Sequence, residues 1–271
     1  MNAADHYLEG NLSAAIEAIA EEIRDEPNNA AKRAFLVELL CFAGDFERAE
    51  KQLNTMVTLD AKAALTASTW RQIILAAQIR KDVFESACIP EVIETPTSAI
   101  EKSLALLVAV HEKSPKDISK YLGVEETPSN DNAHNTLLIN RQAVTDWRDL
   151  DDLNANILEV LASNGKYFWV DFSQVIELEF YKPERPIDLL WRKANIMLTN
   201  GTEGEVFIPA LYPGSADDDD ATKLGRKTEW QDEHGVFRGR GLRTWLVGDD
   251  AKTIMEIDSI ANEALVERAT A

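Results

Sequence analysis

The sequence is poor in the features that mark metal centres, disulfide frameworks and membrane spans. It holds 2 cysteines and 4 histidines in 271 residues, and Cys41 and Cys88 lie too far apart for a paired-cysteine motif. It contains no run of 18 or more apolar residues, and its first residues lack the basic and apolar regions of a signal peptide. We therefore expect a cytoplasmic protein with reduced cysteines and no membrane partner.

Positive charge is also scarce. Lysine and arginine number 28 against 47 aspartates and glutamates, which gives a formal net charge of −19. Such a chain repels phosphate groups, which argues against a broad interface with nucleic acid or with an anionic membrane. A basic or amphipathic protein partner is compatible with this charge.

The N-terminal third contains an internal repeat. The segment from Gly10 to Ile16 recurs 34 positions later, from Gly44 to Glu50, and the apolar residues that follow each copy fall on one face of a helix. This period is typical of tetratricopeptide helix pairs, which stack and present a surface to a protein ligand. The pattern predicts helices at 12–23, 30–43 and 46–57.

Two further helical features complete the predicted array. A third, degraded helix pair is predicted at 63–79 and 83–87, joined at Lys81-Asp82. Ser98 and Glu101 form a candidate capping box for a helix that runs to about Glu112, and we expect this helix to cap the stack.

The second half has a different character, and the polar stretch 124–132 predicts a boundary between a domain at 1–123 and a domain at 133–271. The expected fold class is α+β with two domains: an N-terminal tetratricopeptide-like α-α superhelix, then a mixed, mainly antiparallel β domain with a few helices and an aromatic core. The expected elements are a helix at 150–162, strands at 167–170, 175–180 and 242–247, a hairpin of 196–198 with 206–208 around Asn200-Gly201, and an ambiguous segment at 254–260.

No pattern in the chain predicts catalysis, a cofactor or a metal. The histidines, among them His134, have no ligand spacing, and the consecutive aspartates Asp217–Asp220 point apart, so we expect a solvated loop there. Ser215 lacks the Gly-x-Ser-x-Gly elbow. Gly235, Gly239 and Gly241 fit no nucleotide-binding signature, and Gly225–Thr228 resembles a P-loop only superficially. We therefore expect no catalytic residue, no cofactor and no bound metal.

Two groups of residues are candidates for binding a partner. The first lies on the inner helices of the array, where each residue is equally open to being core: Tyr7, Phe35, Glu38, Leu39 and Phe42. The second is a cationic cluster between positions 223 and 243, of which Arg226, Arg240 and Arg243 are candidates for docking an acidic surface or an anion. The alternative for this cluster is internal pairing with nearby acids, each exposed pair contributing roughly 0 to 1 kcal/mol.

Several blocks of the second half carry a family resemblance. They are Trp147–Asp152, Asn164–Val170, Asp188–Trp191, Pro209–Ser215, Leu224–Trp230 and Leu246–Asp249. In order and spacing these blocks resemble the ImpE family, also called TagJ, an accessory family of bacterial type VI secretion. The resemblance covers almost the whole chain, because that family also begins with a tetratricopeptide-like part.

The resemblance implies a cytoplasmic, non-enzymatic protein that binds the N-terminal helix of the small sheath subunit, in connection with sheath assembly or recycling by the ClpV ATPase. Either domain could supply the groove. One alternative is an enzyme or small-molecule sensor that uses Asp171, Tyr212, Arg226 and Arg240 around an aromatic pocket. Another is a tetratricopeptide co-chaperone that reads C-terminal carboxylates, which ranks last because the first repeats carry few cations.

Overall fold

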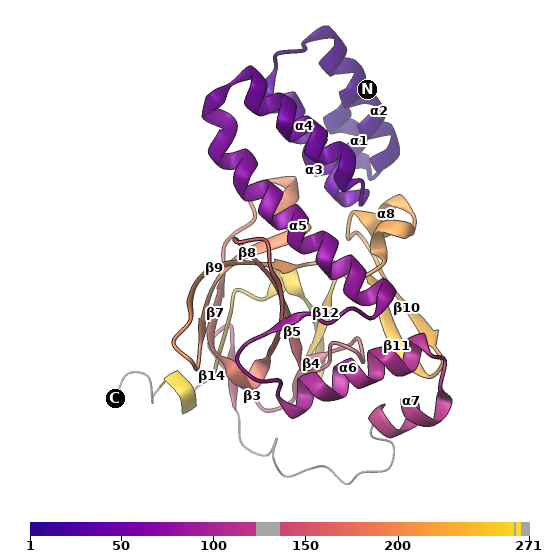
Figure 1. Ribbon diagram of the computed structural model, residues 1–271, viewed down its shortest axis with the longest axis vertical. Coiled ribbons are helices and arrows are strands. Elements are labelled where there is room, and N and C mark those ends of the chain that lie inside the picture. The colour runs from indigo at the N-terminus through magenta and orange to yellow at the C-terminus, as the bar shows by residue number, and fades with distance from the viewer. Residues whose placement is uncertain (123–135, 263, 267–271) are drawn as a thin grey trace.

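The computed structural model describes residues 1–122, 136–262 and 264–266, and it places a helical region beside a β region (Figure 1). The predicted boundary stretch, 124–132, and His134 lie outside the described residues, so the division into 1–123 and 133–271 stays a prediction. The helices are α1 (Ala3–Glu9), α2 (Leu12–Asp25), α3 (Ala30–Phe42), α4 (Phe46–Leu59), α5 (Ala64–Ser86), α6 (Ser98–His111), α7 (Pro115–Leu122) and the short α8 (Asp220–Lys223).

The first four helices form two hairpins. The two copies of the 34-residue repeat correspond to the starts of α2 and α4. Asn11 and Asp45 stand at equivalent positions of the repeat, and each side chain accepts a hydrogen bond from the third helical N–H, of α2 and α4 respectively. Gly10 and Gly44 precede them with φ angles of 87° and 70°, a conformation that favours glycine. The helices predicted at 12–23, 30–43 and 46–57 are therefore confirmed to within two residues.

The predicted third helix pair is wrong. The structure has one helix of 23 residues, α5, that runs through Lys81 and Asp82 without interruption. Neither residue is a helix breaker, and the apolar face continues past them to the buried Val83. The helix ends only at Ala87, which adopts a left-handed conformation with φ 50°.

Helix α6 has nearly its predicted bounds but a different cap and a different neighbour. The hydroxyl of Thr97, not that of Ser98, accepts the N-terminal hydrogen bond, from Ile100, so the predicted capping box is wrong. Instead of capping the stack, α6 lies against the sheet. The reason is strand β1 (Glu91–Val92), which pairs with the sheet edge and directs the chain there.

The β region contains one large sheet and two small ones, and it is mainly antiparallel as predicted. The large sheet has the strand order β1-β6-β5-β9-β8-β7-β14-β2-β3, in which only the β1–β6 pairing is parallel. A hairpin of β10 and β11 and a three-stranded sheet of order β13-β12-β4 complete it. The bounds are β2 (Leu137–Ile139), β3 (Gln142–Val144), β4 (Trp147–Asp149), β5 (Ile157–Ala162), β6 (Tyr167–Asp171), β7 (Val175–Phe180), β8 (Trp191–Leu198), β9 (Glu203–Pro209), β10 (Thr228–Glu233), β11 (Val236–Gly241), β12 (Thr244–Val247), β13 (Asp250–Thr253) and β14 (Ser259–Asn262).

Most strand predictions are confirmed, including the β8–β9 hairpin, but the helix at 150–162 is wrong. That segment forms turns followed by strand β5. Because nearly every residue of β5 is buried, its sequence shows no alternation and is easily mistaken for a helical apolar run. The ambiguous segment 254–260 is a short 3-10 helix followed by the start of β14.

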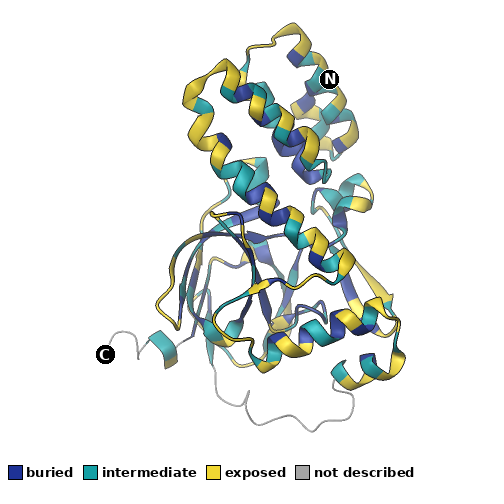
Figure 2. Cartoon of the chain, in the orientation of Figure 1, coloured by how far each residue is buried: buried dark blue, intermediate teal, exposed yellow. Residues whose placement is uncertain are grey.

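Two hydrophobic cores explain how the regions are joined. One core runs without a break from α1–α7 to one side of the large sheet, where it includes Trp169, Trp191 and Phe207. The other packs within the β region around Trp245, which meets Trp147 edge to face at 4.8 Å between ring centroids. Buried positions accordingly continue from the helices into the strands (Figure 2). The helical region is therefore no free-standing solenoid.

Candidate functional site

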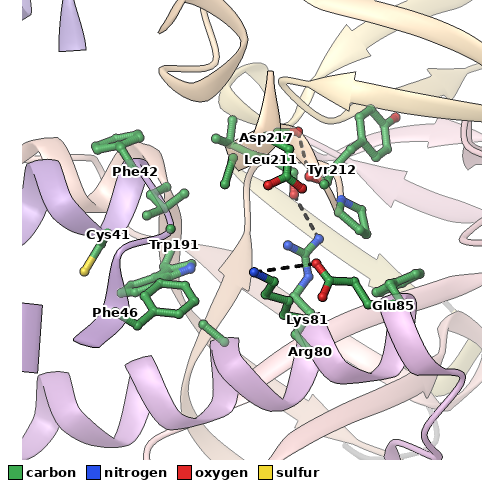
Figure 3. A pocket seen from close by; sticks show the side chains of 18 residues that line it. Cys41, Phe42, Phe46, Arg80, Lys81, Glu85, Trp191, Leu211, Tyr212 and Asp217 are labelled. Carbon is green, nitrogen blue, oxygen red and sulfur yellow. Dashed lines mark hydrogen bonds and ion pairs between the residues drawn. The ribbon is translucent and has the colours of Figure 1, made fainter. Parts of the chain in front are cut away.

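The feature best suited to bind a ligand is a cleft between the two regions, with a cavity of about 120 Å³. We call it the interdomain cleft. Four parts of the chain form it: the α3–α4 corner with Phe42 and Phe46, the C-terminal half of α5, the start of β8 with Trp191, and the loop 211–217 (Figure 3). The loop contains the Tyr212–Ser215 part of one family block, so a segment that carries the resemblance lines the cleft.

The floor of the cleft is apolar. Phe42 and Trp191 are only 1% and 5% exposed, and the rings of Phe46 and Trp191 pack with their centroids 6.3 Å apart. Leu211 and Leu190 lie beside them and are also buried. An apolar side chain that enters from a partner would therefore meet carbon surface on both the helical side and the β side.

Charged side chains of α5 border this floor. Arg80 donates from Nε and Nη2 to the carboxylate of Glu159 at 2.6 and 3.0 Å, and Nη2 also donates to the carbonyl oxygen of Leu211 at 2.9 Å. Next to Arg80 on α5, Lys81 pairs at 3.6 Å with Glu85, which lies one turn further along the helix, near the mouth. Arg80 thus ties the helical wall of the cleft to its loop wall.

Glu159 is the centre of a buried ionic network. It is fully buried on β5, and it accepts hydrogen bonds from Arg80, Arg243 and the Tyr167 hydroxyl. Burial alone would raise the pKa of Glu159, but the guanidinium groups of Arg80 and Arg243 outweigh it and hold the pKa at about 2. The carboxylate is therefore charged and paired, which suits a structural role.

The network continues beneath the loop. Asp149 lies 3.6 Å from Arg243 and accepts hydrogen bonds from Tyr212 Oη at 2.8 Å and from Trp245 Nε1 at 3.0 Å. Burial, together with the nearby Asp149 carboxylate, raises the pKa of Tyr212, so its hydroxyl stays protonated and donates. Tyr212 is thereby fixed as a support of the loop.

The segment from Gly214 to Arg226 also holds the first helix pair in place. Asp220 accepts a hydrogen bond from the backbone N–H of Ser13 at 3.0 Å, at the start of α2. Arg226 donates to the carbonyl oxygens of Tyr7 and Leu8, at the end of α1. An acid at a helix N-terminus and a base at a C-terminus are both favourable placements. The aspartate run predicted as a solvated loop therefore includes a helix cap, and Asp219 likewise caps α8.

The candidates on the inner helices are mostly covered by the chain itself. Leu39 and Phe42 are buried in the core, whereas Tyr7 and Phe35 are half-buried and meet edge to face at 5.9 Å. Glu38 is buried and pairs with Arg185 at 2.7 Å. Burial raises the pKa of Glu38 to about 7, although Arg185 opposes this shift. Contact of these residues with a partner stays a prediction.

The three candidate arginines all have partners within the chain. Besides the α1 contacts of Arg226, Arg240 donates to the carbonyl oxygen of Pro213 at 3.2 Å and lies 3.6 Å from Glu233. Arg243 has no exposed surface. Their role in partner binding stays a prediction, and Arg243 would act only through the residues that it positions.

The residues of the alternative enzyme site do not share one set of interactions. Asp171 accepts hydrogen bonds from Thr97 and from Ser173 N near the start of α6, whereas Tyr212 binds Asp149 inside the β region. In the described parts of the chain, no group of three or more His, Cys, Asp or Glu side chains could hold a metal ion. Within the same residues, no helix is long and apolar enough to cross a membrane.

Phe42 and Tyr212, both candidates from the sequence, do line the cleft, whereas Arg80, Trp191 and the neighbouring Glu159 were not predicted. Glu159 carried a usable signal, because a single acid inside the apolar run 157–161 indicates a buried, paired charge. Arg80 and Trp191 carried none, since their contacts join segments far apart in the chain.

A family model and a curated relative point to the same family, and a solved structure matches the fold of the chain. The family model described as ImpE protein matches residues 141–261. Over 247 residues the chain is 31% identical to a Pseudomonas aeruginosa protein named type VI secretion system accessory component TagJ, with 89% of this chain and 85% of the relative covered. A crystal structure of a Vibrio parahaemolyticus protein matches with a TM-score of 0.85 and 28% identity, covering 96% of this chain and 97% of that one.

Proposed function

Since this chain belongs to the ImpE family together with its TagJ relative, we propose that it is a non-enzymatic accessory protein of type VI secretion that binds the N-terminal helix of the small sheath subunit. Through this contact it affects sheath assembly or the recycling of the sheath by the ClpV ATPase. The proposal places the protein in the cytoplasm, with no nucleic acid and no membrane among its partners.

The observation that carries the proposal is the apolar interdomain cleft in an acidic protein. Helix recognition typically uses an apolar groove that receives anchors at i, i+3, i+4 or i+7. The floor formed by Phe42, Phe46 and Trp191 offers such a surface, and the net charge of −19 favours a partner with basic residues.

The polar groups around the cleft support a binding role over catalysis. Ser215 donates from its hydroxyl to the carbonyl oxygen of Tyr212 at 2.6 Å and accepts from Gly241 N at 2.8 Å, so its oxygen is engaged on both sides. Burial raises the pKa of the Cys41 thiol, which keeps it from acting as a thiolate nucleophile. Among the described residues, the lining of the cleft contains no histidine that could act as a base.

Calorimetric titration with a peptide of the sheath subunit's N-terminal helix tests the proposal. We expect saturable binding with a Kd in the micromolar range, and a scrambled peptide of equal composition is the control. The absence of heat from the native peptide at high micromolar concentration would count against the proposal.

A pull-down from the native cell tests the partner independently. Sheath subunits should be enriched with the tagged protein over a control in which the tag alone is expressed. Recovery of a small-molecule-modifying enzyme complex without any sheath subunit would favour the alternative of an enzyme or sensor.

A further inference from the structure

We propose that the outer edge of β10 is a docking site at which an extended segment of another protein adds as a further strand, and that this segment alternates apolar and basic residues. The proposal goes beyond the function proposed above, because it concerns a second partner segment, in strand rather than helical form. It does not depend on where the sheath helix binds.

Within the described residues, β10 is the longest strand with an open edge. It pairs with β11 alone, over six residues, whereas the edge strands β1 and β3 of the large sheet have two and three residues. The outer side of β11 is already taken, because Phe237 exchanges backbone hydrogen bonds with Asp152, and Gly239 N donates to Asp151. An open edge presents a row of backbone donors and acceptors to a further strand.

The register of the hairpin shows which backbone groups of β10 face outward. Residues of an antiparallel pair alternate between positions that bond to each other and positions whose N–H and C=O point away. On β11 the outward groups are those of Phe237 and Gly239, as their bonds to the segment 151–152 show. Their partners across the hairpin are Asp232 and Trp230. The N–H and C=O groups of these two residues therefore point towards the open edge.

Two exposed aromatic rings lie on one face of the hairpin. Trp230 and Phe237 are 43% and 55% exposed. Trp230 stands opposite Gly239, two residues from Phe237, so the two rings share a face and are diagonal neighbours. Tyr212 packs against Trp230 with ring centroids 5.7 Å apart and holds it from one side. Apolar side chains at alternate positions of an added strand would cover these rings.

The charges of β10 indicate what stands at the other positions of the added strand. β10 contains Glu229, Asp232 and Glu233 and no lysine or arginine. Glu229 and Glu233 alternate with Trp230 and therefore lie on the opposite face. Glu229 keeps 54% of its side chain exposed although Lys227 binds it. Basic residues that alternate with the apolar ones would lie beside these acids, and opposite charges on neighbouring strands attract.

A second copy of the chain fits this edge less well than a basic strand does. If two β10 strands paired antiparallel about their common centre, Glu229 of each would stand opposite Asp232 of the other, and no base of either strand would offset them. The acids of β10 thus oppose self-association through this edge.

Hydrogen exchange in the presence of a synthetic peptide tests the proposal. The probe is a short peptide of alternating valine and lysine, and the control is an isomer with the same residues in two blocks, which carries the same charge. At physiological salt the alternating peptide should slow exchange of the Trp230 and Asp232 amides severalfold, because each N–H gains an acceptor. The block isomer should leave these amides unchanged.

Two N-methylated forms of the alternating peptide isolate the backbone contact. Methyl groups on the valine nitrogens remove the N–H groups that would face β10 in an antiparallel strand, and methyl groups on the lysine nitrogens remove those of a parallel strand. One form should lose the protection of β10 and the other should keep it. Equal behaviour of the two forms would overturn strand addition.

A pair of variants tests the aromatic face. Trp230→Ala should weaken binding of the alternating peptide severalfold in calorimetry, because the valines lose the surface that they cover. Tyr181→Ala removes a ring of similar exposure, 49%, just after β7, and should bind as the unaltered protein does. Equal affinities in the two variants would contradict a role for Trp230.

Three further results would overturn the proposal. The first is unchanged exchange at Trp230 and Asp232 with the alternating peptide, and the second is equal protection by the block isomer, which would reduce the contact to net charge. The third is protection of these amides in the free protein that increases with protein concentration, which would assign the edge to a second copy. Each of them leaves the proposed binding of the sheath helix standing.

Discussion

The helical region and the β region bury different kinds of side chain. Helices α1–α4 bury mainly aliphatic residues and keep nearly all their charges at the surface, with Glu38 the exception among the residues described. The β region buries several charged residues in paired form, among them Glu159, Arg243 and Asp149. Apolar contacts tolerate small shifts between helices, whereas ion pairs impose a defined geometry, so the charges fix how the two regions meet.

The largest effect is expected from breaking the ionic network. Glu159→Ala leaves the buried Arg243 and the largely covered Arg80 without their shared partner and should lower the free energy of unfolding by about 3 to 5 kcal/mol. Urea unfolding measures the loss. Lys51→Ala, which removes an exposed pair with Glu47 on α4, is the control and should change stability by less than about 1 kcal/mol. If Glu159→Ala and Lys51→Ala lost similar free energies of unfolding, the buried ion pairs of the β region would be no more important for stability than an exposed pair of the helical region.

A large-to-small substitution in the aliphatic core of the helices should also lower the stability of the protein strongly. Leu53→Ala creates a cavity in α4 and should cost about 3 kcal/mol, against little change for the exposed Thr58→Ala on the same helix. Because one core spans both regions, helical circular dichroism and tryptophan fluorescence should report a single transition in both variants. Two separated transitions would mean that the regions unfold independently.

The fold was predictable from sequence where the signal is local, and less so where it depends on distant contacts. The 34-residue repeat and the apolar faces that follow Gly10 and Gly44 predicted the first helices, and Asn200-Gly201 predicted the β8–β9 hairpin. The continuity of α5 and the strand at 157–162 were missed, because packing on both sides conceals their periodicity.

The candidate site was harder to predict than the fold. Tyr212–Ser215 was recognised as a family block, and this segment does line the interdomain cleft. The opposite wall comes from α3, α4 and α5, and no local pattern places it against that loop. The hydrogen bond from Arg80 to the Leu211 carbonyl oxygen, which joins the two walls, spans 131 positions of the chain.

Glu38 gives the interface between the regions a pH dependence. Its pKa is raised from 4.5 to about 7, so the folded state holds a proton that the unfolded state releases in this window. This residue therefore makes the free energy of unfolding fall as pH rises, by about 2 kcal/mol between pH 5 and pH 7. Glu38→Gln has no carboxyl group at this position, so the fall in the free energy of unfolding that Glu38 causes should vanish. The variant should therefore become more stable relative to the unaltered protein as pH rises. Parallel pH profiles of the two proteins would contradict this assignment.

The smallest loss of stability is expected when the contact between Asp220 and the first helix pair is removed. Asp220→Ala removes the hydrogen bond to Ser13 N and should cost about 1 kcal/mol or less. Hydrogen exchange in α1 and α2 should quicken while exchange in the β region stays unchanged. Asp250→Ala, at an exposed position in β13, is the control, and equal exchange in both variants would show that Asp220 does not restrain the helices.

The uninterrupted course of α5 limits how the protein can change in evolution. Its 23 residues extend over about 35 Å and carry Trp70, which stacks on Arg185, as well as Arg80, which binds Glu159. One inserted residue between these two positions would turn Arg80 by about 100° around the helix axis, away from its carboxylate. An insertion of seven residues would restore the facing of Arg80 but move it by about 10 Å along the axis, so the spacing of Trp70 and Arg80 on this helix is fixed by their two contacts together.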